Sequence, residues 1–333
     1  EKESFNIVLL GIGGAKHDGP DLSDTIILAN VNVKQNKVYM FSIPRDLWLP
    51  GEQDKINVVY AKAQKDNNGI SDVGDAIFRI TGQKIDYVVV LDFLGFTALV
   101  DYLGGIDVDV SNTLDDYHYP VEGMENDACG KTNEDIEVFT ATASAETEFW
   151  DFFNCRYKHI HVNKGLTHMN GETALEFVRS RHGVGSEGSD FARSRRQQLV
   201  ISALKDKSFS LGVILYPVKL IGVYNILKAN INTNIDVEEI DDFIKLARKL
   251  QNGEVKNYVI DQGNETEKRY GLLRNPPITE EYRLKWVLIP RTGNGNFSEI
   301  QEYVGCIVGG KEFLISKNGI LIPTPTPTTA INN

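Results

Sequence analysis

NIVLLGIGGAKHDGPDLSDTIILANVNVKQNKVYMFSIPRD, residues 6–46, contains the strands around which the rest of the fold is expected to assemble. Two apolar runs, Asn6–Leu10 and Thr25–Asn30, have the length and composition of short buried strands. A third run, Val38–Ser42, follows the polar turn Lys34–Lys37. The second and third runs therefore predict a β-hairpin.

Helical and strand patterns alternate after this hairpin. Ile70–Thr81 has apolar residues at helical spacing, and the glycine that follows it is a plausible C-terminal stop. Ile85–Leu91 predicts a strand, Phe93–Leu103 a helix and Ile106–Val110 another strand. This order predicts a layered α/β core with some antiparallel pairing.

The periodicity fails between Pro120 and Lys164, which predicts an inserted loop or a small helical excursion. Regular patterns return further along the chain. The elements predicted there are helices over Gly171–Arg181, Ala192–Leu204, Val237–Leu250 and Ser298–Tyr303, and a strand over Trp286–Ile289. The chain ends in a Pro/Thr tract, Pro323–Ala330, typical of an extended stalk or linker.

Composition limits the class of protein. The chain has 333 residues, of which 41% are hydrophobic and 24% charged, as in ordinary globular proteins. No apolar run approaches the roughly 18 residues that span a bilayer. The net charge of −11 argues against nucleic acid as a partner, because phosphate binding needs a basic face. A strongly basic cluster in so acidic a chain would therefore need a local explanation.

Three cysteines are present. Cys129 and Cys155 flank the irregular segment, and a disulfide between them would close it if the compartment is oxidising. The alternative is three unrelated free thiols, with Cys306 as the third.

The loop Gly11–Ser23 after the first strand is a candidate cation site. A dinucleotide-binding fingerprint is excluded, because Lys16 stands where the third glycine belongs and a strand follows instead of a helix. Asp18, Asp21 and Asp24 remain as clustered oxygen ligands suited to Mg²⁺. On this fragment alone, the interpretation as ordinary turn residues is the stronger one.

A second candidate is Ser42–Asp46 (SIPRD), at the end of the predicted hairpin, where Pro44 stops the strand and projects Arg45 and Asp46 from the sheet edge. In isolation such a pair is usually a surface salt bridge of little energetic value. Lys55 follows soon after, at another strand-to-helix transition.

The strongest signal is a concentration of positive charge that contains only two acids, Glu187 and Asp190. Arg193 and Gln197 are four apart on a predicted helix and share a face, whereas Arg196 points aside from them. The cationic and imidazole side chains of this segment are Arg179, Arg181, His182, Arg193, Arg195 and Arg196. A solvated face normally mixes signs, and guanidinium binds phosphate oxygens in bidentate fashion, so we favour an anion site over a solvated face.

A zinc site built from Cys155, His159, His161 and His168 is disfavoured. Their spacing lacks the short ligand pairs at both ends that mark structural zinc.

Five motifs in this order resemble the signature of the LytR–CpsA–Psr family. They are SDT (Ser23–Thr25), SIPRD (Ser42–Asp46), KIN (Lys55–Asn57), NGETALEFVRSRH (Asn170–His182) and DFARSRRQQ (Asp190–Gln198). The resemblance covers the chain from Asn6 to about Leu204, and the later segment fits only loosely. It implies an α/β fold with a mixed central β-sheet sandwiched between helices, in a single main domain. We assign that catalytic domain to residues 1–315, with an insertion at about 121–164 and a flexible Pro/Thr-rich tail at 316–333.

The resemblance also implies a function. Members of this family are phosphotransferases that move a glycopolymer from a polyprenyl-pyrophosphate carrier to peptidoglycan with Mg²⁺ as cofactor. It further implies an apolar groove for the polyprenyl chain, an N-terminal membrane anchor preceding Glu1, and a location in the cell envelope on the outer face of the cytoplasmic membrane. That location supports the Cys129–Cys155 bridge.

Site roles follow from the matching positions. Arg45, Arg179, Arg181, Arg193 and Gln197 would hold the pyrophosphate, with Lys55 as a weaker candidate. Asp24 would bind the metal, and Asp46 would organise Arg45 or act as base for the acceptor hydroxyl. Such groups suit phosphoryl transfer, which needs positioning and neutralisation of oxygens.

One departure concerns the metal. The family has an aspartate directly after the first strand, where this chain has Gly11–Gly14, so Asp18 or Asp21 would have to reach in. Two other functions stay open: a pyrophosphohydrolase on polyprenyl-linked substrates, and a non-catalytic module that binds lipid-linked glycans.

Overall fold

The computed structural model describes residues 3–15, 19–143, 145–210, 217–264, 269–317 and 319–321. By backbone contacts the chain forms two compact units. Unit 1 comprises Glu1–Asp92 and Ile231–Asn333, and unit 2 comprises Phe93–Asn230. The domain boundaries predicted from the sequence stay predictions.

Unit 1 is built on a six-stranded mixed sheet with strand order β11-β6-β1-β2-β3-β12. Its strands are β1 (Ser4–Ile12), β2 (Ser23–Asn32), β3 (Lys37–Ser42), β6 (Tyr87–Asp92), β11 (Ile231–Thr233) and β12 (Glu254–Val259). The predicted hairpin is confirmed as the antiparallel pair β2–β3. β1 runs antiparallel to β2 and parallel to β6, so the sheet is mixed as expected.

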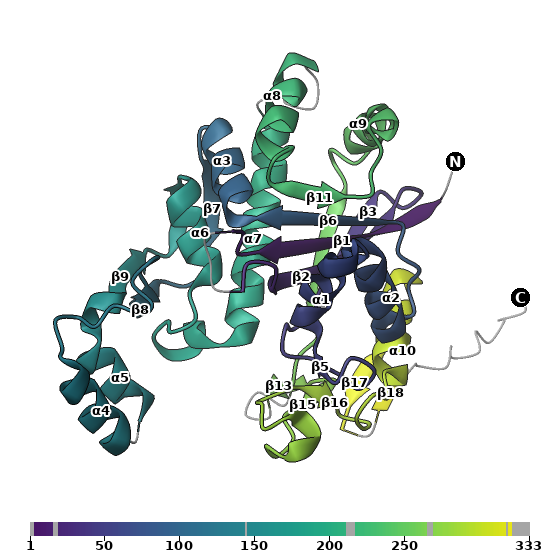
Figure 1. Cartoon of the computed structure of the whole chain (residues 1–333). Helices are drawn as coiled ribbons and strands as arrows, with labels where there is room; N and C mark the ends of the chain where they lie inside the picture. Colours follow the sequence, from purple (N-terminus) through teal and green to yellow (C-terminus); the bar gives the residue numbers. More distant parts are fainter. Residues whose placement is uncertain are drawn as a thin grey trace, which may run out of the picture. The chain divides into compact units, whose positions relative to one another are not determined.

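Helices pack on both faces of this sheet. On one face lie α1 (Val59–Ala63), α2 (Gly69–Thr81) and α10 (Ser298–Val308), whose buried apolar residues join those of the strands in one core (Figure 1). The other face is covered near the start of β1 by α9 (Ile240–Lys249), where the Phe243 ring meets the edges of other aromatic rings. The predicted arrangement of a sheet between helices is therefore confirmed.

Short strand pairs complete unit 1. They are β4 (Trp48–Leu49) with β5 (Asp54–Lys55), β13 (Gly263–Asn264) with β14 (Arg269–Tyr270), β15 (Leu273–Arg274) with β16 (Ile289–Pro290), and β17 (Leu314–Ser316) with β18 (Gly319–Leu321). The last pair extends past residue 316, where the sequence predicted a flexible tail, and Ile315 pairs with Ile320 in it. The predicted Pro323–Ala330 tract lies outside the described residues.

Unit 2 packs helices around two small antiparallel strand pairs. The helices are α3 (Phe93–Tyr102), α4 (Asn133–Thr142), α5 (Glu146–Phe152), α6 (Gly171–Arg179), α7 (Asp190–Ser210) and α8 (Pro217–Leu227). The strands are β7 (Ile106–Val110) with β10 (Gly165–Met169), and β8 (Leu114–Pro120) with β9 (Tyr157–Val162). Their apolar side chains form a core separate from that of unit 1. Within the described ranges, no helix is long and apolar enough to cross a membrane.

Most predicted elements are confirmed, with ends shifted by a few residues. Helix α2 stops at Gly82, which adopts the left-handed conformation expected of a C-terminal glycine. The main error is the predicted irregular stretch up to Lys164, because its last part, Tyr157–Val162, is a strand paired with β8. Only Ile160 and Val162 are buried there, so the apolar signal of this strand was short.

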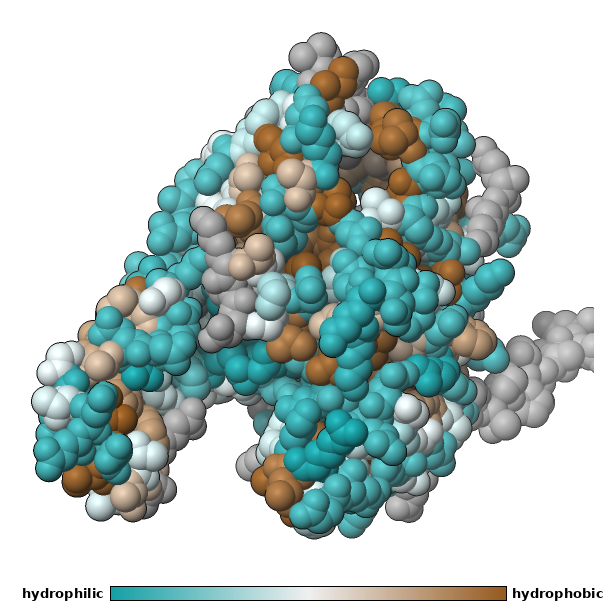
Figure 2. All heavy atoms as spheres, viewed as in Figure 1, coloured by the Kyte–Doolittle hydropathy of each residue, from teal (hydrophilic) through white to brown (hydrophobic). Residues whose placement is uncertain are grey.

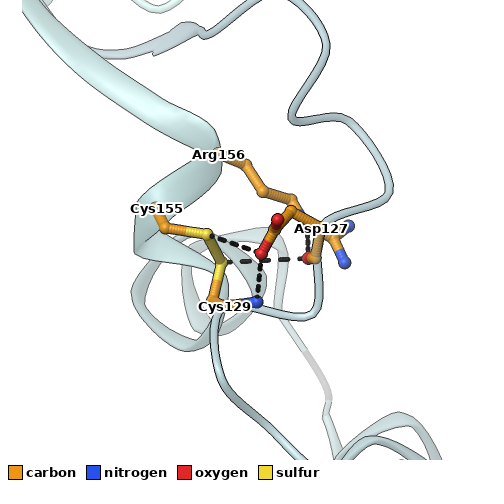
Figure 3. Close-up of a disulfide and its surroundings, with 4 residues drawn as sticks. All are labelled: Asp127, Cys129, Cys155 and Arg156. Atoms are coloured by element: carbon orange, nitrogen blue, oxygen red, sulfur yellow. Dashed lines mark hydrogen bonds between the residues drawn. A yellow bond between two sulfur atoms is a disulfide. The ribbon is translucent and has the colours of Figure 1, made fainter.

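The remainder of the insertion is a small helical unit closed by a disulfide. The Cys129–Cys155 bridge is present, and the Arg156 guanidinium reaches back to donate a hydrogen bond of 2.7 Å to the Asp127 carbonyl (Figure 3). The Asp127 carboxylate also accepts the Cys129 N–H at 2.7 Å. Between the cysteines, α4 and α5 bring together the rings of Phe139, Phe149, Phe152 and Phe153. The insertion thus has its own aromatic core.

We expect reduction of this bridge to loosen the insertion. The disulfide closes a loop with a sequence separation of 26 residues, and removing such a constraint costs roughly 3 kcal/mol of stability. In limited proteolysis, Cys129→Ser/Cys155→Ser should be cleaved between the two cysteines much faster than the wild type. The control is Cys306→Ser, which removes a buried free thiol in unit 1. Equal cleavage of the two variants would show that the aromatic core holds the insertion without the bridge.

Candidate functional site

Four of the predicted site residues form one chain of charged contacts in unit 1. Arg45 donates through Nη1 to the Asp24 carboxylate, and its Nε lies 3.6 Å from Asp46 Oδ2. Lys55 Nζ donates to Asp46 Oδ1. Asp46 is buried at 6% exposure, and the other three side chains are partly exposed. Two cations and two carboxylates therefore alternate at one edge of the sheet.

Strand register explains the Asp24–Arg45 contact. In the β2–β3 pair Ile27 faces Ser42, and continuing this antiparallel register by three residues brings Asp24 opposite Arg45. A β-bulge adds to the effect, since Asp24 is the extra residue where the β1–β2 register shifts. Bulges commonly redirect a side chain beside a functional site. Beyond β3, the Leu47 N–H donates to the Pro44 carbonyl at 3.1 Å, which makes the turn that presents Arg45 and Asp46.

Lys55 is positioned by its neighbour Asp54. The Asp54 carboxylate accepts hydrogen bonds from the Lys55 N–H at 2.9 Å and from Lys285 Nζ at 2.8 Å. Burial by itself raises the pKa of Asp54, but these hydrogen bonds and the positive charges of Lys285 and Lys62 outweigh it and lower the pKa. The ionised carboxylate thus anchors β5 and holds Lys55 toward Asp46.

The carboxylates predicted to bind a metal do not form a complete ligand set by themselves in the described residues. The Asp24 side chain is 39% exposed and keeps oxygen lone pairs beyond those used by Arg45. Among the residues that the structure describes, neither Asp24 nor Asp21 belongs to a set of three carboxylate, imidazole or thiol ligands with atoms within 4.8 Å of one another. Asp18 lies outside the described residues. One carboxylate supplemented by water and phosphate oxygens is a normal Mg²⁺ environment. Asp24 therefore fits a Mg²⁺ ion whose other ligands are water and the phosphate oxygens of a substrate.

Asp92 is a carboxylate that the sequence reasoning missed. It ends β6, beside Ile12 of β1 in the parallel register. A Cβ placed on Gly14, which has φ +81°, would lie 3.1 Å from the Asp92 Cβ. The Asp92 side chain thus lies against Gly14, in the segment where the resemblance led us to expect an aspartate. The strand-to-helix junction after Leu91 was the only sequence signal for it.

In unit 2 the start of α6 positions Arg179 at its end. The Asn170 side chain accepts the Thr173 N–H at 2.9 Å and caps the helix. Gly171 permits α6 to approach α3, because a Cβ there would lie 2.4 Å from the Thr97 carbonyl oxygen. At the other end of the helix, the Arg179 guanidinium lies over the Phe93 ring, 4.4 Å from its centroid.

Arg181 follows and is itself exposed, between residues that the buried Asp116 organises. Asp116 Oδ2 accepts from Ser180 Oγ at 2.6 Å and from the His182 N–H at 3.2 Å. The residues on both sides of Arg181 are therefore fixed by one carboxylate of β8. Sequence reasoning missed Asp116 because this contact spans more than 60 residues of chain.

On α7, Arg193 and Gln197 share one face as predicted, and both are 9% exposed. Arg193 Nη2 lies 2.8 Å from Asp190 Oδ1. Arg179 and Arg193 each have close neighbours of their own, so a direct convergence of guanidiniums on one point stays a prediction.

Two arginines of the positively charged segment have a structural role. Arg195 is about one-third exposed and contacts the Glu187 carboxylate, as does the buried Arg196. Burial raises the pKa of Glu187, but the Asn112 hydrogen bond at 2.9 Å and the two arginines outweigh it and lower the pKa. Two of the arginines in this segment are therefore paired with Glu187 inside the protein.

The four residues weighed as a zinc site do not form one. Cys155 is in the disulfide, and His168 Nδ1 pairs with Asp107 Oδ1 at 2.7 Å. His159 and His161 meet elsewhere, at Asp115. The insertion contacts the segment after α6 through Trp150. The centroid of a Trp150 ring lies 4.8 Å from that of the His182 ring.

Comparisons with solved structures place this fold among known ones. The crystal structure of Bacillus subtilis TagV superposes with a TM-score of 0.58 at 23% identity, covering 92% of this chain and 97% of that one. The shared architecture is the mixed central sheet with its helices. The sequence matches the LytR_cpsA_psr family over residues 1–275, and the chain belongs to that family.

Curated relatives carry names that describe an activity. TagV of B. subtilis (strain 168), a polyisoprenyl-teichoic acid–peptidoglycan teichoic acid transferase, is 28% identical over 246 residues, which are 72% of this chain and 52% of TagV. TagT of the same strain, with the same activity in its name, is 28% identical over 220 residues, 64% of this chain and 55% of TagT. This chain therefore spans about half the length of these two relatives.

Proposed function

We propose that this protein transfers a phosphate-linked glycopolymer from a polyprenyl-pyrophosphate carrier to peptidoglycan on the outer face of the cytoplasmic membrane. The observation that carries the proposal is the alternating network of Asp24, Arg45, Asp46 and Lys55 at the sheet edge. Family membership and the names of the relatives support it.

The network suits a phosphoryl transfer between two oxygens. The acceptor hydroxyl attacks the phosphorus that carries the glycan, the bond from that phosphorus to the bridging oxygen breaks, and polyprenyl phosphate leaves with the electron pair. Arg45 and Lys55 carry positive charges that can neutralise the phosphate oxygens. The hydroxyl proton passes to Asp46 or to water.

Asp46 fits the organising role better than the role of base. Its two oxygens already face different cations, Oδ1 toward Lys55 and Oδ2 toward Arg45 at 3.6 Å. Arg179, Arg181, Arg193 and Gln197 of unit 2 supply further phosphate ligands in this proposal. A Mg²⁺ ion bound at Asp24 would add charge neutralisation at the pyrophosphate.

The lipid part of the substrate needs apolar surface. In unit 2, α3 packs against α8, and the apolar side chains exposed on these helices are Leu94, Tyr102, Ile221 and Tyr224. Figure 2 shows apolar side chains at the surface around α8. Such a surface on neighbouring helices suits a polyprenyl chain.

Release of polyprenyl phosphate from a short synthetic polyprenyl-pyrophosphoryl glycan tests the proposal. With peptidoglycan present, we expect release and wall-linked glycan in Mg²⁺ and neither product in EDTA. Arg181→Ala should lose about 1.5–3 kcal/mol of substrate binding, roughly 10- to 150-fold.

The other outcomes separate the alternatives. Release that needs no acceptor would identify a pyrophosphohydrolase. Tight lipid binding without release in any condition would identify a binding module and contradict the proposal.

A further inference from the structure

Two histidines converge on one carboxylate of the antiparallel β8–β9 strand pair. His159 and His161 are two apart on β9 and so share a face of the strand, and Asp115 of β8 faces His161 in the register. Asp115 Oδ1 lies 2.9 Å from His159 Nε2 and 2.8 Å from His161 Nδ1. The three ligand atoms lie within 4.8 Å of one another.

Both ring nitrogens of His161 face hydrogen-bond acceptors. Nδ1 faces the Asp115 carboxylate, and Nε2 faces Asn163 Oδ1 at 3.1 Å. Both partner atoms are acceptors, whereas a neutral imidazole has a single N–H. If Nε2–H donates to Asn163, then Nδ1 needs a second proton or a metal cation between it and Asp115.

The surroundings resemble those of bound metals. An outer hydrogen bond that fixes the tautomer of a histidine, such as the one to Asn163, is usual at metal sites. The His159 ring is held by parallel stacking on Tyr117, with centroids 4.1 Å apart. The side chains of His159 and His161 are each 44% exposed, so an ion can enter from solvent.

We propose that Asp115, His159 and His161 bind a zinc-class divalent cation. Imidazole nitrogen with one carboxylate is a donor set for Zn²⁺ and its neighbours in the transition series, whereas Mg²⁺ prefers oxygen ligands. Three protein ligands leave a fourth position for water or for an external donor. None of the three residues is among the proposed phosphate ligands, so this inference does not depend on the proposed transferase activity.

The position of the site gives the cation a structural consequence. A cation bound here would join β8 and β9 on their exposed face. Its ligand Asp115 directly precedes Asp116, which accepts hydrogen bonds from Ser180 and the His182 N–H. A cation that fixes β8 against β9 therefore stabilises the residue that organises the segment around Arg181.

Isothermal titration of the tag-free chain with ZnCl₂ tests this inference. We expect one equivalent to bind, and His159→Ala, His161→Ala and Asp115→Asn should each weaken binding at least about tenfold, as even outer-shell losses at metal sites do. The matched control is His168→Ala, because that imidazole pairs with the single carboxylate of Asp107. Titration with Co²⁺ should give visible absorption bands in the wild type and the control that His161→Ala lacks.

Either of two results would overturn the proposal. One is absence of a saturable Zn²⁺ isotherm for a wild type whose circular dichroism confirms folding. The other is equal Zn²⁺ affinity of His161→Ala and His168→Ala, which would assign the binding to another place on the surface.

Discussion

Arg196→Ala will lower the free energy of unfolding by about 3–5 kcal/mol, the range for removing one partner of a buried ion pair. The Arg196 side chain is 1% exposed and binds three backbone carbonyls: Phe177 at 2.8 Å, Ser180 at 2.6 Å and Glu187 at 2.8 Å. It also donates to Glu187 Oε2 at 3.0 Å. Two of these carbonyls lie at the end of α6, where the helix leaves its last carbonyl groups without partners.

Alanine would leave all four acceptors without this guanidinium and open a cavity beneath α7. Urea unfolding followed by circular dichroism would measure the loss. Arg79→Ala is the control, because Arg79 makes a surface pair with Glu52 that is worth about 0–1 kcal/mol. Equal midpoints for the two variants would refute the structural role of Arg196.

The structural role of Arg196 could be predicted only in part from the sequence. From sequence, Arg196 could be excluded from the face of Arg193 and Gln197 by helical spacing alone. Its burial could not be predicted, because the acceptors are backbone carbonyls of another helix. The pairing of Glu187 with both Arg195 and Arg196 was equally hidden, since it depends on how the turn after Gly183 folds back.

Other contacts were within reach of sequence reasoning. The predicted β2–β3 hairpin has a register in which Ile27 faces Ser42, and the same register places Asp24 opposite Arg45. The contact between the two motifs that contain these residues could thus have been predicted from the register of the hairpin. The Asp46–Lys55 contact could not, because it depends on the short β4–β5 pair, whose two-residue strands have no periodic signal.

Strand β9 was missed because only two of its six residues are buried. In Tyr157–Val162 only Ile160 and Val162 face the core, while His159 and His161 alternate with them. Two buried residues are too few to distinguish a strand from a loop. The alternation of the strand brings both imidazoles to one face and toward Asp115.

Arg45→Ala will reduce transfer of glycan to peptidoglycan about 100-fold or more, the usual effect of deleting one donor that stabilises a charged transition state. Arg45 is chosen because its guanidinium is held between two carboxylates, by a hydrogen bond to Asp24 and by an Nε–Oδ2 distance of 3.6 Å to Asp46. A donor fixed in this way needs little reorganisation when charge develops on phosphate oxygens.

Arg45→Lys separates charge from geometry. Lysine retains the positive charge but lacks the planar fork that binds Asp24 and a phosphate at once, so we expect activity between those of Arg45→Ala and the wild type. The transfer assay in Mg²⁺ would compare both variants with Arg79→Ala, an exposed arginine of the same unit that should retain full activity. If Arg45→Ala transferred glycan as fast as Arg79→Ala, the network at the sheet edge would be structural. The pyrophosphate would then have to be held by the arginines of unit 2, and Arg179 and Arg193 would be the next residues to replace.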